Sequence, residues 1–285
     1  MAGTNPSNWR SVNEFESDML AIRAELDAFQ AANPHARVGP LATNISLRVS
    51  REELDRYLRI CKAARVDIVI SVSGDPTRLI GQVHEAGGVV WHDATSLRFA
   101  EKAIGAGADG IIAIGAGGGG HSGTVTPLTL IPQIRAMFGG TIVMAGAVSN
   151  GAAIRAAEVL GADLAYLGTR FIATQESDAP DDYKRMIVEA GVTDLAYTPA
   201  VNGVAANWLA ASLRSHGFDP RDPRVPAHHD VSHLPPGMQP WKTVWSAGQG
   251  VGLIDDIPTV AQLVRRLRDE YVQACDRPSM ADAAK

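Results

Sequence analysis

The sequence predicts an α/β fold in which short parallel strands alternate with helices. Three observations support this class: apolar runs of strand length alternate with helical patterns, a helix–turn–strand unit recurs, and glycine-rich loops follow several of the apolar runs. With 285 residues, of which 46% are hydrophobic, the chain can bury one large core. Repeated units of this kind favour a barrel or a doubly wound sheet, organised as one main domain.

The chain begins with a predicted helical segment at residues 1–35. From Ser11 to Gln30 the apolar residues are spaced alternately by four and three positions, which places them on one face of a helix. These residues are Phe15, Met19, Ile22, Leu26 and Phe29. Pro34 ends the helix because helical geometry is disfavoured for the residue before a proline.

A βα core is predicted at residues 36–178. Six apolar runs there are long enough only for strands buried on both faces. They lie at about 38–44, 67–72, 88–92, 110–114, 141–145 and 164–167. A weak internal repeat supports them, since the segments that begin at Cys61, Ala106 and Leu160 each read as a helix end, a tight turn and a strand.

Residues 179–250 depart from this alternation. Prolines, aspartates and glycines are scattered through the segment, which predicts helices and loops that cover the barrel mouth. Its tryptophan-containing stretches, 207–209 and 241–245, are interpreted as packing against the barrel in preference to lining a substrate pocket. Three histidines in its proline-rich part favour a solvated turn over a metal site; they are His228, His229 and His233.

Residues 251–275 are predicted to contain a last amphipathic helix that starts near Pro258. Asp255 and Asp256 precede it, and carboxylates at this end suit the helix dipole. The apolar face of the helix is expected to comprise Val260, Leu263, Val264, Leu267 and Tyr271. Residues 276–285 are expected to form a frayed tail.

Composition argues against several classes of partner. The formal net charge is -5, and no run of Lys or Arg resembles a nucleic-acid-binding arm. No stretch of about 18 apolar residues is present to span a membrane. Cys61 and Cys275 stand far apart without a CxxC motif or a neighbouring His cluster, so neither a disulfide framework nor a zinc site is indicated. These features are typical of a cytoplasmic protein.

The most informative loop for chemistry is Gly115–Gly123, directly after an apolar run. Six of its nine residues are glycine, which permits positive φ and close approach of the backbone to a ligand. His121 is its only ionisable group, and imidazole exchanges protons near neutral pH. A flat ring or a phosphate would fit against such a loop; the alternative is a flexible surface loop with an incidental histidine.

Two further loops follow strands in the same way. Residues 145–151 lie between a strand and a helix, where free N–H groups at a helix N-terminus form an anion site. Residues 167–171 combine a strand end with Gly168 and Thr169. In (β/α)-barrels a phosphate site often lies on the loops after the last two strands. Each loop taken alone also fits an ordinary βα turn.

These motifs, in this order, resemble the nitronate monooxygenases, formerly called 2-nitropropane dioxygenases. The resemblance covers roughly residues 38–267 and rests on the segments 119–123, 126–133, 144–147, 161–177 and 246–250. It implies a TIM (β/α)8-type barrel that binds flavin mononucleotide (FMN).

The resemblance assigns roles position by position. His121 matches the family's active-site base, which removes an α-proton from a neutral nitroalkane, a task that suits imidazole. Asn44 matches a polar residue that faces the flavin ring. The other residues matched to FMN binding are Gly118, Gly119, Gly120, Gly146, Ala147, Gly168, Thr169 and Gln249. The substrate-pocket candidates are Ser122, Ser246, His92 and Asp93.

Two departures from the family pattern stand out. Family members often carry Lys where this chain has Asp93, which cannot supply a positive charge near the flavin. A closed barrel of this type needs eight strands, whereas six are found, so the first two are expected to be missing through truncation or a late start codon. Met1–Gly3 resembles part of a flavin-contacting segment of the family, and the likeness is interpreted as coincidental because no strand precedes it.

The predicted function is that of an FMN-dependent monooxygenase that oxidises alkyl nitronates with O2 to carbonyl compounds and nitrite. One alternative is an NAD(P)H-dependent flavin reductase of the quinone or enoyl-acyl-carrier-protein type on the same barrel. Another is a non-catalytic barrel that binds a phosphorylated metabolite, or a truncated barrel that binds nothing. The expected partners are a small nitronate or nitroalkane and O2, without nucleic acid, membrane or metal; a homodimer is left open.

Overall fold

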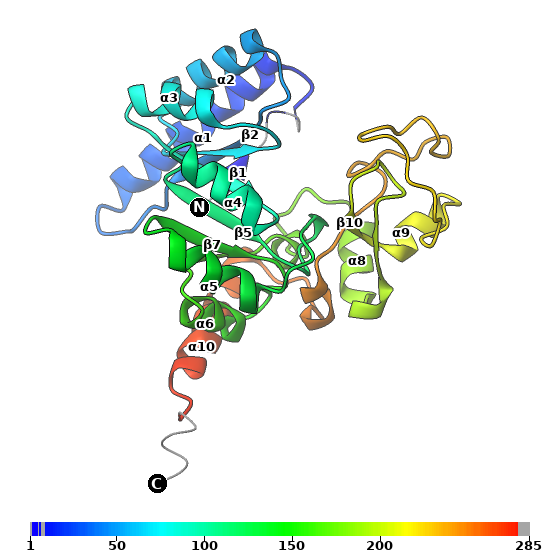
Figure 1. The fold of residues 1–285 in the computed structure, drawn as a ribbon. Helices are drawn as coiled ribbons and strands as arrows, with labels where there is room; N and C mark the ends of the chain where they lie inside the picture. The colour runs from blue at the N-terminus through cyan, green and yellow to red at the C-terminus, as the bar shows by residue number, and fades with distance from the viewer. Residues whose placement is uncertain (1, 5, 7–8, 279–285) are drawn as a thin grey trace. The chain divides into compact units, whose positions relative to one another are not determined.

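Helices and parallel strands alternate along much of the chain in the computed structural model, which describes residues 2–4, 6 and 9–278 (Figure 1). The chain divides into two units, Met1–Ile112 and Ala113–Lys285. Three of the six predicted strands lie wholly in the first unit, and the second unit carries the glycine loops that follow the later strands.

The first unit is a run of parallel strands joined by helices. Its elements are β1 (Ala2–Thr4), α1 (Val12–Ala32), β2 (Leu41–Ser46), α2 (Arg51–Ala63), β3 (Ile68–Val72), α3 (Thr77–Glu85), β4 (Val89–Ala94) and α4 (Leu97–Gly105). β1 pairs with β2, β2 with β3 and β3 with β4, all in parallel. The register places Asn44, Ile70 and Trp91 side by side.

Helix α1 buries only the first part of its predicted apolar face. Ser11 caps the helix by accepting a hydrogen bond from the backbone N–H of Glu14. Phe15 and Met19 are fully buried in a core cluster of the first unit. Phe29, at the other end of the helix, is 53% exposed. The predicted helix is therefore confirmed, but its buried face does not extend to Phe29.

The second unit combines βα elements with a small antiparallel sheet. Its elements are β5 (Gly110–Ile114, which begins in the first unit), β6 (Gly120–His121), α5 (Pro127–Met137), β7 (Thr141–Ala145), α6 (Gly151–Val159), β8 (Leu164–Tyr166), α7 (Thr169–Ile172), α8 (Asp181–Glu189), β9 (Leu195–Thr198), β10 (Ala206–Leu209), α9 (Ala210–Ser215) and α10 (Val260–Cys275). β7 lies between β5 and β8, whereas β10 lies between β6 and β9 in a separate sheet. Most of the predicted tail, residues 279–285, falls outside the described part of the chain.

All six predicted strands are confirmed, as β2, β3, β4, β5, β7 and β8. The count of six is nevertheless too low, because Ala2–Thr4 forms the further strand β1, parallel to β2. Ala2 and Gly3 thus belong to the sheet themselves. Three residues are too few to show the periodicity by which strands are recognised in a sequence.

The prediction of helices and loops for residues 179–250 is incomplete. Helices α8 and α9 are present, but so are strands β9 and β10, which pair with each other antiparallel. β10 also pairs with the two-residue strand β6, placing Ala206 opposite His121. Strands this short, paired with segments far away in sequence, leave little local pattern.

A repeated aspartate ties neighbouring strands together. Asp67, Asp109 and Asp163 each precede a strand of the internal repeat, and each side chain accepts a hydrogen bond of 2.7 to 2.8 Å from a backbone N–H of the strand next to it. In return, the backbone N–H of each aspartate donates to the backbone carbonyl of the strand residue whose N–H its side chain accepts. The partners are Leu41, Val90 and Ile142, in that order. This reciprocal pair sets the register of each strand against its neighbour.

Helix α10 begins with Thr259 as its N-cap and not with the predicted aspartate pair. The side chain of Thr259 accepts from the backbone N–H of Gln262, and the Gln262 side chain accepts from the N–H of Thr259. Leu263 and Leu267 are buried, but Val264 is 51% exposed. The apolar face is therefore narrower than predicted.

Candidate active site

Loops of the second unit enclose a cavity of about 180 Å³. The three predicted loops, after β5, β7 and β8, all contribute to it, together with a later segment around Ser246. Of the residues singled out from the sequence, those that line the cavity are Gly118, Gly119, His121, Gly146, Ala147, Gly168, Thr169 and Ser246. The fold thus brings together loops that are separated along the chain, as parallel βα units do at the carboxyl ends of their strands.

Close packing of backbone on backbone shapes this cavity. Gly146 adopts a φ of 112°, and a Cβ added there would lie 3.1 Å from the nitrogen of Gly118. A Cβ on Gly119 would lie 2.8 Å from the nitrogen of Gly248. Ala147 also has a positive φ, 58°, which is strained for a residue with a side chain. Gly146 and Gly119 favour glycine because the loops approach each other too closely there for a side chain.

The N-terminus of α6 does not offer all its donors to the cavity. The N–H of Gly151 donates to the Glu270 carboxylate at 2.7 Å, and the N–H of Ala153 donates to the Asn150 side chain at 2.9 Å. These bonds satisfy two of the donors that a helix start leaves open. These two N–H groups are therefore not available to the anion site predicted within residues 145–151, whereas part of the loop before the helix lines the cavity.

His121 lies on β6 at the cavity, half-buried, with side chains from the later segment around its ring. The indole of Trp241 stands edge-on to the imidazole, with 4.9 Å between ring centroids and an angle of 79°. The ring of His229 is 6.2 Å away, and Nδ2 of Asn202 lies 3.5 Å from Nε2 of His121. The sequence indicates His121 but not these neighbours, because no motif connects residues 81 positions apart such as His121 and Asn202.

The two tryptophans of this segment differ in environment. Trp208 is fully buried in a core cluster with Val201 and Leu213, as the packing interpretation expects. Trp241 is 46% exposed, and its ring contacts both Trp208 and His121. Packing alone therefore does not describe Trp241, which borders the candidate site.

Three further predicted residues do not line the cavity but take part in contacts that fix the glycine loop. They are Gly120 and Ser122, within the loop, and Gln249. Ser122 is buried and accepts a hydrogen bond of 3.1 Å from Nδ2 of Asn207, which also pairs across the sheet with Gly120. The N–H of Gln249 donates to a carbonyl of the same loop at 2.8 Å. Asn207, which is 3% exposed and also donates to the carbonyl of Gly118, was missed in the sequence.

Asn44, His92 and Asp93 belong to the first unit, whereas every residue that lines the cavity belongs to the second. His92 and Asp93 are consecutive in β4, so their side chains point to opposite faces of the strand. Nδ1 of His92 lies 2.8 Å from Oγ of Ser71, and burial lowers the pKa of His92. Burial raises the pKa of Asp93 to about 7. Oδ1 of Asn44 is buried without a hydrogen-bond partner among the described residues.

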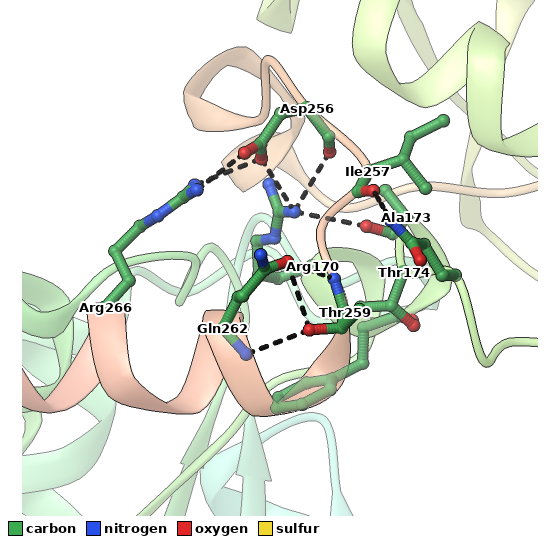
Figure 2. A network of polar contacts seen from close by, with 10 residues as sticks. Arg170, Ala173, Thr174, Asp256, Ile257, Thr259, Gln262 and Arg266 are labelled. Carbon is green, nitrogen blue, oxygen red and sulfur yellow. Dashed lines mark hydrogen bonds and ion pairs between the residues drawn. The ribbon is translucent and has the colours of Figure 1, made fainter.

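Arg170, directly after Thr169, connects this loop to the segment before α10 (Figure 2). Its side chain is 2% exposed, and Nη2 donates to the carboxylate and carbonyl of Asp256 and to the carbonyl of Ala173. Asp256 also accepts from Arg266, and this hydrogen bond is the main reason that the pKa of Asp256 is lowered. Asp256 therefore neutralises a buried guanidinium, a role that the sequence did not indicate.

The described residues provide neither a cluster of metal ligands nor a membrane-spanning helix. They contain no group of three or more His, Cys, Asp or Glu side chains placed to hold a metal ion. Within the same part of the chain, no helix has the length and apolar character needed to cross a membrane.

Comparison with known sequences identifies relatives over most of the chain. The family model described as nitronate monooxygenase matches residues 17–270. A nitronate monooxygenase of Paraburkholderia phytofirmans is 30% identical over 219 residues, which cover 70% of this chain and 59% of that protein. An octahydro-indene-carboxyl-CoA dehydrogenase of Mycobacterium tuberculosis is 34% identical over 139 residues, which cover 48% of this chain and 39% of that protein. The chain thus spans less than two thirds of the length of these relatives.

Two solved structures resemble this chain in fold over most of its length. FabK from Thermotoga maritima superimposes with a TM-score of 0.67 at 27% identity, covering 89% of this chain and 83% of that one. A nitroalkane oxidase from Streptomyces ansochromogenes gives a TM-score of 0.62 at 26% identity, covering 90% and 78% of the two chains.

Proposed function

Because the chain belongs to the nitronate monooxygenase family, we propose that it is an FMN-dependent oxidoreductase that oxidises alkyl nitronates with O2 to carbonyl compounds and nitrite. One observation carries this proposal: a single cavity joins three strand-end loops to the half-buried imidazole of His121. The corresponding fold is an incomplete (β/α)8-type barrel with its core at residues 36–178. Residues 179–250, the cap segment, then supply the side chains around His121.

The lining of the cavity suits the phosphate of FMN. Among the described residues that line it, none carries a carboxylate, and Ser149 and Thr169 contribute hydroxyl groups. Hydroxyl and backbone N–H groups are the donors by which glycine loops hold phosphates. At Gly168 an added Cβ would meet nothing within 4 Å, which leaves room for a ligand against the backbone. FMN, when bound, supplies the electron chemistry, and the loops at Gly146 and Gly168 would hold its phosphate.

His121 has a separate task in this reaction. A neutral nitroalkane must lose a proton from its α-carbon before oxidation, whereas a nitronate has already lost it. An imidazole at the cavity is suited to accept that proton near neutral pH. Comparing the oxidation rates of the two substrates therefore distinguishes an effect on proton removal from an effect on oxidation.

We predict that His121→Asn slows oxidation of 1-nitropropane by on the order of 100-fold, because general-base catalysis contributes at least that much. Oxidation of propyl nitronate should change by less than about threefold, since no proton is removed. The protein is incubated with FMN, desalted and examined by absorbance, and oxygen uptake is then measured with each substrate. His35→Asn, at an exposed histidine of the first unit, is the matched control.

Two results would count against the proposed function. If the wild-type chain retains no flavin after desalting, the cavity is not an FMN site. If flavin is retained but propyl nitronate drives no oxygen uptake, the chemistry is different even though the cofactor is right.

A second candidate is a flavin enzyme that transfers electrons without O2. This candidate is supported by the similarity of the chain to a carboxyl-CoA dehydrogenase, at 34% identity over 139 residues. In its NAD(P)H-dependent form, NADH or NADPH would bleach the bound flavin rapidly in the absence of oxygen. Slow or absent bleaching, together with nitronate-dependent oxygen uptake, supports the first candidate.

A further inference from the structure

Three histidines of the second unit form a series that starts at the cavity. The ring of His121 lies 6.2 Å from that of His229, and the ring of His229 lies 4.3 Å from that of His228. His121 is half-buried, whereas His229 and His228 are exposed. The series therefore runs from the candidate base to solvent.

The backbone holds His229 in this place against a local preference. His229 adopts a φ of 66°, in the left-handed region that residues with a side chain occupy uncommonly. Its N–H donates to the carbonyl of Asn202 at 2.6 Å. Asn202 is 2% exposed, and its amide nitrogen lies 3.5 Å from Nε2 of His121. One buried residue thus contacts both histidines and sets their spacing.

Trp241 limits the space around His121 in a similar way. It also has a positive φ, 61°, and its ring stands edge-on to the imidazole. Two residues of the cap segment with strained backbone therefore border the same histidine. Strain of this kind is typical of functional sites, because the surrounding structure has to maintain it.

We propose that His229, followed by His228, carries the proton that His121 removes from a neutral substrate to solvent. The inference rests on the proposed function, in which His121 is the base. The α-carbon–hydrogen bond breaks, its electron pair remains with the substrate as the nitronate, and the proton moves to His121. It then passes to His229, directly or through one water, and on to His228 and bulk water. His121 returns to its neutral form, and no electrons are exchanged in these steps.

Imidazole is suited to each step because it both accepts and releases protons near neutral pH. His121 must also lose this proton before it can act as a base in the next turnover. His121 is only partly exposed and borders Trp241, so a second acceptor shortens the path by which it loses its proton between turnovers.

The test uses His229→Asn in the FMN-loaded chain. Asparagine tolerates positive φ as histidine does, so the loop is retained, but its amide cannot carry a proton. Under anaerobic conditions, nuclear magnetic resonance follows the exchange of the α-deuterons of deuterated 1-nitropropane with water. We expect about a tenfold slower exchange and an equal loss in aerobic kcat with nitroalkane. Added imidazole should restore both rates, and propyl nitronate oxidation should stay within about twofold.

Two comparisons complete the design. His228→Asn should reduce exchange less than His229→Asn, because water can replace the outer position. His35→Asn should leave it unchanged. Wild-type exchange in His229→Asn would overturn the proposal, as would a loss with both substrates that imidazole does not restore. If the wild type exchanges deuterons but does not oxidise nitronate, the proposed oxidation fails, and the exchange rate of His229→Asn still decides the relay.

Discussion

His121 acquires its surroundings from residues that come much later in the chain. The imidazole itself belongs to the glycine loop, but Asn202, His229 and Trp241 determine which of its sides another molecule can approach. Each of these neighbours is polar or aromatic, so the ring is ordered by directional contacts as well as by packing. Removal of a neighbour is therefore expected to alter proton transfer more than folding.

The carboxyl group of Asp93 predicts how the stability of the protein depends on pH. Burial raises its pKa to about 7, so the folded protein binds the proton more tightly than the unfolded chain does. Stability is unaffected below the unfolded pKa near 4, falls as pH rises from there to about 7, and stays at the lower level above it, because the carboxylate is then ionised in both states. Asp93→Asn should therefore raise the free energy of unfolding by on the order of 2 kcal/mol at pH 8, allowing for partial exposure, and hardly at pH 4.

Urea denaturation at the two pH values measures this difference. Asp178→Asn, at an exposed aspartate of the second unit, controls for the loss of one negative charge. A variant at Asp93 that is less stable than wild type at pH 8 would show that the carboxylate is favoured in the fold.

At the level of elements, short polar contacts connect neighbouring strands and helices. The aspartates of the internal repeat join strand pairs in both units by the same reciprocal hydrogen bonds. Each also pairs with a basic side chain of an adjacent helix or loop; these are Arg23, His84 and Arg135. The repeat seen in the sequence therefore reflects a common way of setting strand register, in addition to a common turn.

The contacts of Asp256 predict unequal effects of two substitutions (Figure 2). Asp256→Ala should cost about 2–4 kcal/mol, because it leaves the buried Arg170 guanidinium without its carboxylate. Arg266→Ala should cost less than about 1 kcal/mol, because Arg266 is 42% exposed and solvent screens its interaction. Urea denaturation of both variants measures the difference. Because Asp256→Ala removes both ion pairs, equal losses would mean that the pair with the buried Arg170 adds nothing to stability.

For the whole molecule, the division into two units has a consequence for ligand binding. All residues that line the cavity belong to the second unit, so FMN should stabilise that unit directly. At a concentration of about 100 times its dissociation constant, a ligand that binds only the folded state adds about 2.7 kcal/mol. Hydrogen exchange should slow most in the loops at residues 115–119, 145–149 and 166–169.

Riboflavin, which lacks the phosphate, is the matched ligand for this experiment. It should protect the loops at 145–149 and 166–169 less than FMN does, because these are the proposed phosphate loops. Equal protection by both ligands would place the phosphate elsewhere.

The sequence by itself determined the βα character of the chain, six of its strands, the loops at their ends and the family. Apolar strand runs and glycine-rich turns are local properties, because a few consecutive residues decide whether a segment is buried and where the backbone can turn. His121 and the phosphate-loop glycines were accessible for the same reason, since each lies in a short motif.

Only the tertiary structure decided what surrounds these motifs. It added β1 and the β6–β10–β9 sheet, placed Trp241 and His229 against His121, and paired Arg170 with Asp256. Such contacts join residues far apart in the chain, so no local pattern encodes them. Likewise, the pKa of Asp93 depends on how many groups bury it, a quantity that exists only once the chain has folded.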